Sequence, residues 1–158
     1  MVTIDSAITG GDREIVANVL QAALVDLVDV SLQAKQAHWN VTGPTFRSLH
    51  LQLDEVVTLA REHADVVAER AAALGISPDG RVKTLADSVQ TPQLDSGYLQ
   101  AELVAESIAA LLLMVVYRFR DYVEQTDEAD PVTQDLLIAA TQGLEQQHWM
   151  FQAMTVES

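Results

Sequence analysis

The sequence predicts an all-α protein, a bundle of four long helices with one long connection between the second and the third. Apolar residues recur every three or four positions through four long segments, as in helices that bury one face. Only 4 of the 158 residues are proline and 7 are glycine, too few for the many turns of a β-sandwich. A single polar stretch of about twenty residues interrupts the helical pattern near the middle of the chain.

The first helix is expected to run from about Asp12, a suitable N-cap, to Trp39. Its apolar positions are spaced alternately four and three residues apart and form one continuous stripe. The stripe consists of Val16, Leu20, Ala23, Leu27, Val30 and Ala34. Gly43 and Pro44 then interrupt the chain and let the next helix start. Residues 1–10 are expected to form a short N-terminal tail on a single domain that covers residues 1–158.

The second helix is expected to begin at Phe46 and to stop at Gly75. Its core stripe reads Phe46, Leu49, Leu53, Val56, Ala60, Ala64, Val67, Ala71 and Leu74. The polar connection that follows contains Pro78 and Pro92 and has room for a short helix around Thr84–Val89. A connection of this length can cross from one end of a bundle to the other.

The third helix is expected over about Tyr98 to Gln125, and the fourth begins after Asp130 as its cap. The middle of the third helix, Ile108 to Val116, is apolar nearly all round, so more than one of its sides should be buried. The core stripe of the fourth helix consists of Leu137, Ala140, Leu144, Phe151 and Met154.

The composition excludes several classes of function. The chain has 9 Lys and Arg against 23 Asp and Glu, a formal net charge of −14, which opposes binding to DNA phosphates and favours attraction of cations. It has no cysteine, which excludes disulfides, thiolate zinc sites and thiol nucleophiles. We expect a cytoplasmic protein that does not enter a membrane, because no signal-peptide pattern is present and the longest apolar run is about half a membrane span.

Candidate metal ligands concentrate at the end of the first helix and along the second. At 100° per residue, those of the second helix fall within about 100° of one another, on a face turned away from its core stripe. They are His50, Asp54, Asp65 and Glu69, and His38 lies at the end of the first helix. The same face carries Leu51 and Val57 and is too apolar for plain solvent exposure. We therefore expect another protein to cover it.

The spacing of these residues predicts which protein covers that face. The pair His50 and Asp54 lies about 16 Å along the helix from the pair Asp65 and Glu69, too far for one ion. However, positions 50 and 69 have the same midpoint as positions 54 and 65. Two copies of the helix that cross antiparallel about a two-fold axis would therefore place His50 of one copy opposite Glu69 of the other, and the two aspartates opposite each other. His38 is expected to complete each of the two sites.

Each such site would offer two imidazoles and three carboxylates but no sulfur. This donor set suits redox-active iron better than a structural zinc ion, because carboxylates accept Fe(II) and Fe(III) in turn and neutral imidazoles hold Fe(II). Any one of these residues alone is more often a surface or capping group. The shared face, the spacing and the common midpoint together favour a metal site.

Three stretches of the sequence carry a family pattern. They are Lys35-Gln36-Ala37-His38-Trp39-Asn40-Val41 followed by Gly43-Pro44 and Phe46, then Leu49-His50 followed by Asp54-Glu55, and then Asp65 followed by Ala68-Glu69-Arg70. This pattern resembles the Dps mini-ferritins over about residues 10–155. The resemblance implies a ferritin-like four-helix bundle, twelve copies of which form a hollow shell from two-fold dimers. It also implies oxidation of Fe(II) by hydrogen peroxide or oxygen, storage of ferric iron and protection against oxidative stress.

The resemblance further implies that the iron centre takes His38, His50 and Asp54 from one subunit and Asp65 and Glu69 from its partner. By the same resemblance, other residues have roles near this centre or at the shell wall, and each has a plainer alternative. Trp39 would donate an electron or quench radicals, or is only an interface aromatic. Glu55 would start mineral growth, or is only an exposed acid. An iron-entry pore would be lined by Glu128, Asp130 and Asp135, or these acids only cap the fourth helix.

DNA binding is not expected, although some members of this family bind DNA through terminal tails rich in Lys and Arg. The first twelve residues of this chain contain no basic residue, and its last four are Thr-Val-Glu-Ser. Two further classes of function stay open. One is a structural or nucleoid-associated assembly whose carboxylates only complete an interface, and the other is a related cage with hydrolytic, metal-assisted chemistry.

Overall fold

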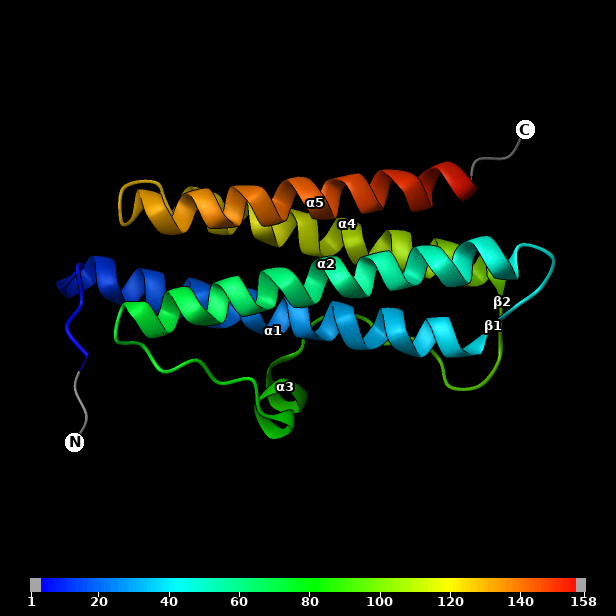
Figure 1. The fold of residues 1–158 in the computed structure, drawn as a ribbon, viewed down its shortest axis with the longest axis horizontal. Helices are drawn as coiled ribbons and strands as arrows, with labels where there is room; N and C mark the ends of the chain where they lie inside the picture. The colour runs from blue at the N-terminus through cyan, green and yellow to red at the C-terminus, as the bar shows by residue number, and fades with distance from the viewer. Residues whose placement is uncertain (1–3, 156–158) are drawn as a thin grey trace.

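The computed structural model describes residues 4–155, and in that range the chain forms four long helices, one short helix and two short strands (Figure 1). The elements are α1 (Gly10–Asn40), β1 (Val41–Thr42), α2 (Phe46–Ala73), α3 (Val82–Ser88), β2 (Leu99–Gln100), α4 (Ala101–Thr126) and α5 (Pro131–Thr155). The described residues do not include 1–3 and 156–158. Part of the expected N-terminal tail and most of the last four residues, which were considered above for DNA binding, therefore lie outside them. The predicted all-α four-helix bundle is confirmed.

The four long helices pack as two antiparallel pairs, α1 with α2 and α4 with α5 (Figure 1). The long connection carries α3 along α1 and brings the chain back to the end of the bundle where α2 begins (Figure 1). There β1 pairs with β2 in parallel, with Val41 opposite Leu99. This strand pair links the α1–α2 turn to the start of α4, and so the turn that follows His38 is held at the end of the bundle.

The core stripes predicted for α1 and for most of α2 and α5 are buried. Phe46 and Met154 are the exceptions: they are 40% and 46% exposed. Both lie in a terminal turn of a helix, where neighbouring helices no longer enclose the side chain. The predicted ends also shift. Helix α1 begins at Gly10 after Thr9, so Asp12 lies in its first turn, where a negative charge favours the helix dipole.

Helix α1 is long and apolar enough to cross a membrane by length and composition, with a mean hydropathy of 1.7 in its most apolar stretch. However, 61% of that stretch is buried inside the bundle. In this fold the buried apolar residues of α1 form part of the hydrophobic core.

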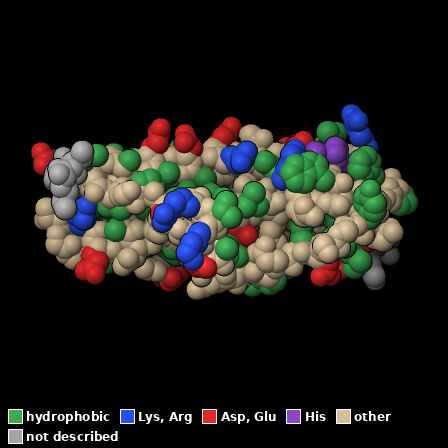
Figure 2. Space-filling model, turned by 90° about the horizontal axis from the view of Figure 1, so that it is seen from below, with side chains coloured by type: hydrophobic (Ala, Val, Ile, Leu, Met, Phe, Trp, Pro, Cys, Tyr) green, Lys and Arg blue, Asp and Glu red, His purple; other side chains and the backbone are tan. Residues whose placement is uncertain are grey.

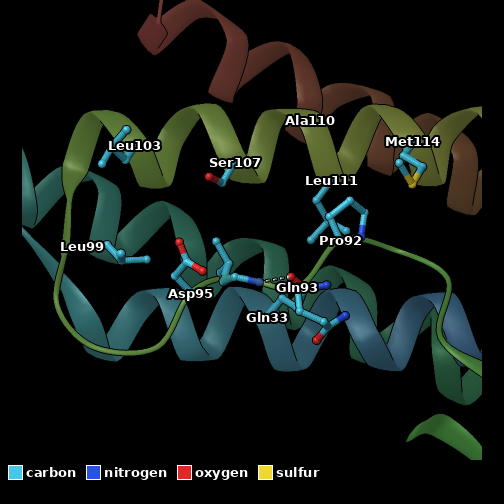
Figure 3. Close-up of a pocket in the computed structure, with 11 residues that line it drawn as sticks. Gln33, Pro92, Gln93, Asp95, Leu99, Leu103, Ser107, Ala110, Leu111 and Met114 are labelled. Carbon is cyan, nitrogen blue, oxygen red and sulfur yellow. Dashed lines mark hydrogen bonds between the residues drawn. The ribbon is translucent and has the colours of Figure 1, made fainter. Parts of the chain in front are cut away.

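A buried polar network fixes the connection on α1. Asp29 of α1 accepts hydrogen bonds from Gln33 (2.9 Å), from Gln93 (3.1 Å) and from the hydroxyl of Thr91. The backbone N–H of Leu94 donates to the side-chain oxygen of Gln33 at 3.2 Å. A cavity of about 360 Å³ remains between this part of the connection and α4, with Leu103, Leu111 and Met114 on its α4 side (Figure 3). None of the predicted site residues lines it.

Candidate metal centre

The end of α1 and the first turns of α2 bring His38 and His50 together. Their rings stack with centroids 3.6 Å apart and planes inclined by 20°. Nδ1 of His38 lies 2.8 Å from the backbone carbonyl oxygen of His50, and Nδ1 of His50 lies 2.9 Å from that of His38. The two histidines therefore hold each other in place through reciprocal hydrogen bonds.

These hydrogen bonds also decide which ring nitrogen can bind a metal. A carbonyl oxygen only accepts, so each Nδ1 carries the proton and donates it. In the neutral imidazole, Nε2 then keeps its free lone pair, the donor that a metal ion takes. A backbone carbonyl behind each ring is the usual second partner of a metal-binding histidine. Each imidazole is thus held in one tautomer, with Nε2 as its acceptor.

Asp54 lies one helical turn beyond His50, beside His38. Its Oδ1 accepts a hydrogen bond from Nζ of Lys35 at 2.5 Å and lies 3.3 Å from Nδ1 of His38. The hydrogen bond from Lys35 lowers the pKa of Asp54, and the nearby imidazoles act in the same direction. The side chain is 44% exposed. An ionised and accessible carboxylate therefore stands beside the two imidazoles.

The other two predicted ligands are not part of this group. Asp65 and Glu69 are exposed and lie further along α2, about 16 Å from Asp54 to Asp65 at the rise of a helix. Within residues 4–155, no three His, Asp or Glu side chains are arranged to hold one metal ion. Each protomer thus carries two separated groups of donors, and the sharing of a site between copies stays a prediction.

Helices α1 and α2 carry exposed apolar side chains, and a shallow hollow lies between the two helices. Exposed apolar side chains on α1 and α2 include Leu32 (53%), Trp39 (65%), Leu51 (48%) and Val66 (40%). A shallow hollow of about 260 Å³ lies between the helices and is lined by Leu24, Val28 and Ser31 of α1 and by Arg61, Ala64, Asp65 and Ala68 of α2. Figure 2 shows histidine side chains at one end of the molecule, next to basic and hydrophobic side chains. Such a surface suits contact with another protein.

Glu55 lies beside Asp54 but belongs to a second hollow, between α2 and α5. This hollow of about 370 Å³ is lined by Asp54, Glu55, Thr58, Leu59, Glu62 and Gln147. Asp54 therefore borders both the histidine pair and an acidic wall. Glu62 was not singled out in the sequence, although its place two helical turns after Glu55 is the spacing that puts both on one side of α2.

The three predicted pore residues have different surroundings. Glu128 and Asp135 are exposed, whereas Asp130 is only 5% exposed. Asp130 caps α5: it accepts from the backbone N–H of Thr133 (3.3 Å) and from Arg70 (2.6 Å). Burial opposes the charge, but the hydrogen bonds from Arg70 and Thr133 prevail and lower the pKa of Asp130. For this residue, the geometry favours the helix cap over the pore.

Comparison with known proteins shows the family of this chain. The family model of the ferritin-like domain matches residues 17–157, so the chain is a ferritin-like protein. The DNA protection during starvation protein of Mycolicibacterium smegmatis is 38% identical over 141 residues, which cover 87% of this chain and 75% of that protein. The solved structure of Mycobacterium smegmatis Dps in its tetragonal form superposes with a TM-score of 0.93 at 31% identity and covers 100% of this chain and 95% of that one. The chain belongs to the Dps family.

One relative carries a different description. The fine tangled pili major subunit of Haemophilus ducreyi is 34% identical over 146 residues, which cover 92% of this chain and 77% of that protein. Similarity at this level therefore extends to a protein that is described by a structural role.

Proposed function

We propose that this protein is a cytoplasmic ferroxidase and iron store of the Dps type. It oxidises Fe(II), with hydrogen peroxide or oxygen as the electron acceptor, and keeps the ferric product inside a hollow shell of twelve copies built from two-fold dimers. The observation that supports this most is the pair of stacked imidazoles with fixed tautomers beside the ionised Asp54. These are donors that bind Fe(II) and tolerate Fe(III).

In the proposed centre, His38, His50 and Asp54 of one protomer face Asp65 and Glu69 of the partner subunit. The partly apolar hollow between α1 and α2, with Asp65 on its wall, supports a contact between copies over this face. Each hydrogen peroxide takes one electron from each of two Fe(II) ions and two protons, and yields two water molecules. Because both electrons leave together, no hydroxyl radical is released, which would protect the cell from oxidative damage.

Other residues serve the same proposal. Trp39, next to His38 and 65% exposed, would supply an electron or quench a radical near the iron. Glu55 would receive ferric iron for mineral growth, since it shares a hollow with Asp54. Glu128 and Asp135 would attract Fe(II) to an entry pore, and Asp130 would hold the start of α5 in place behind them.

The direct test is a titration of the metal-free protein with Fe(II) without oxygen, followed by peroxide, with the particle mass measured on the same sample. We expect saturable Fe(II) binding, rapid oxidation on addition of peroxide and a particle of twelve times 17.2 kDa. Oxidation no faster than that of free Fe(II) would contradict the ferroxidase. A particle of dimer mass would contradict the shell.

A structural assembly is the second candidate, because the pilus subunit of Haemophilus ducreyi is among the similar proteins. In that case the carboxylates of α2 would only complete an interface between copies. The same titration separates the two functions, since a purely structural assembly would take up no stoichiometric amount of Fe(II).

DNA protection, which the names of several relatives describe, would here come from removal of iron and peroxide rather than from DNA binding. The formal charge of −14 per chain is repeated in every copy and repels phosphates at physiological salt. We expect no shift of duplex DNA in a gel at neutral pH with metal-free protein. A clear shift under these conditions would show that the charge argument is wrong.

A further inference from the structure

The cation nearest to the proposed centre belongs to the protein itself. Lys35 lies one turn before His38 on α1, and its Nζ is 2.5 Å from Oδ1 of Asp54. The same oxygen lies 3.3 Å from His38. The ammonium group therefore neutralises the carboxylate that a metal ion must use. Lys35 and Lys83 are the two lysines of the sequence.

This contact can open without disturbing the fold. Lys35 is 33% exposed and Asp54 is 44% exposed, so both groups are readily hydrated when they separate. A lysine ammonium is a compact, strongly hydrated charge on a flexible stem, and it can turn into solvent when another cation takes its place. A cation that binds Oδ1 of Asp54, the oxygen beside His38, has to displace this ammonium first.

The free energy needed to displace the ammonium is similar for all divalent cations. The free energy that each cation gains from its new ligands differs. Mg²⁺ and Ca²⁺ use oxygen ligands, and Mg²⁺ gives up its water reluctantly. Fe(II) and Co(II) also bind imidazole nitrogen, which His38 and His50 present together. The displacement raises the dissociation constants of all these cations by a similar factor. For weakly bound cations the raised constant exceeds the concentration at which they are present, so they no longer occupy the site.

We infer that Lys35 is a tethered counter-ion that sets the affinity threshold of the centre, keeping cations that use only oxygen ligands off Asp54 while those that also bind His38 and His50 displace it. Lys35 is thus a positioning residue that determines which cations occupy the site. The inference rests on the proposed function, because it takes these three residues as the Fe(II) donors.

The test compares the whole assembly with Lys35→Gln, using Co(II) as a probe that is not oxidised on binding. Calorimetry and the visible absorption of Co(II) give its affinity, with and without millimolar Mg²⁺. We expect Lys35→Gln to bind Co(II) about tenfold more tightly, and Mg²⁺ to compete with Co(II) in this variant only. Lys35→Met, which keeps the length of the stem, should behave like Lys35→Gln, whereas Lys35→Arg should exclude Mg²⁺ like the original protein.

Lys83→Gln is the matched control, because Lys83 pairs with Asp87 on the surface of α3 and has no contact with the histidines. If Lys35→Gln and Lys35→Met keep the original Co(II) affinity and still exclude Mg²⁺, the inference is wrong while the proposed function stands. If the unaltered protein itself fails to bind Co(II) and Fe(II), the proposed function is wrong.

Discussion

Two ion pairs each include one residue of α2, and they differ in how far the fold encloses them. Lys35 and Asp54 are 2.5 Å apart, with 33% and 44% of their side chains exposed. Arg70 and Asp130 are 2.6 Å apart, with only 19% and 6% exposed. In both pairs the pKa of the aspartate is lowered. The difference lies in what else the carboxylate can do.

Asp130 is buried, and three donors share its Oδ2: the backbone N–H and the hydroxyl of Thr133, and the guanidinium of Arg70. Asp54 has one strong partner, is 44% exposed and lies 3.3 Å from Nδ1 of His38. Exposure, rather than charge, separates the carboxylate that we propose as a metal ligand from the one that holds two helices together.

The largest expected effect concerns the open carboxylate. We expect the double variant His50→Ala and Asp54→Ala to lower the rate of Fe(II) oxidation with peroxide by at least about 100-fold, because the centre loses two donors. The particle mass should not change, since neither side chain belongs to the core. Asp87→Ala, which removes an exposed carboxylate on α3, serves as the control. A rate close to that of the original protein would rule out these ligands.

The next effect concerns the enclosed carboxylate. Asp130→Ala should lower the free energy of unfolding at pH 7 by about 2–4 kcal/mol, because α5 loses its cap and Arg70 loses its partner. The folded pKa of Asp130 lies below the ordinary value of 3.8. Its stabilising contribution is therefore present above that value and disappears as the pH falls through the folded pKa.

Urea unfolding at pH 7 and near pH 3, at one fixed protein concentration, measures both parts of this prediction. The difference between Asp130→Ala and the original protein should shrink at the lower pH. Asp130→Asn, which keeps an oxygen that can cap α5, should lose less. If both variants lost the same free energy of unfolding at both pH values, neither the capping oxygen nor the ion pair would account for the loss.

The smallest expected effect is that of Lys35→Gln on thermal stability, in contrast to that of Asp130→Ala. Lys35→Gln should leave the thermal midpoint of unfolding within about 2 °C of the original, because exposed ion pairs contribute little to stability. A large drop, comparable with that of Asp130→Ala, would show that the pair Lys35 and Asp54 is a structural contact. Differential scanning calorimetry of the two variants side by side provides the comparison.

The sequence predicts the four helices well, because burial of one face imposes a period that can be read from apolar residues alone. It does not predict the pair β1 and β2, since two-residue strands carry no period. It also gives no sign that Asp29 is buried, because its partners Thr91 and Gln93 lie more than sixty residues away in the chain.

For the candidate site, residue types and spacing identify His38, His50 and Asp54, which the fold brings together. The reciprocal histidine hydrogen bonds could not be predicted, because they depend on the backbone path of the α1–α2 turn. The burial of Asp130 could not be predicted either, because an aspartate before a proline suits a cap and a pore equally well until Arg70 is placed.

In the proposed function each iron centre is shared by two protomers, and a mixing experiment tests this sharing most directly. One variant carries His50→Ala and Asp54→Ala, and the other carries Asp65→Ala and Glu69→Ala; each alone should be inactive. After unfolding and joint refolding in equal amounts, half of the dimers contain one copy of each, and one of the two centres in such a dimer has all its ligands. The account predicts that about a quarter of the original peroxide-dependent oxidation of Fe(II) returns. No return of activity in properly assembled mixed particles would contradict it.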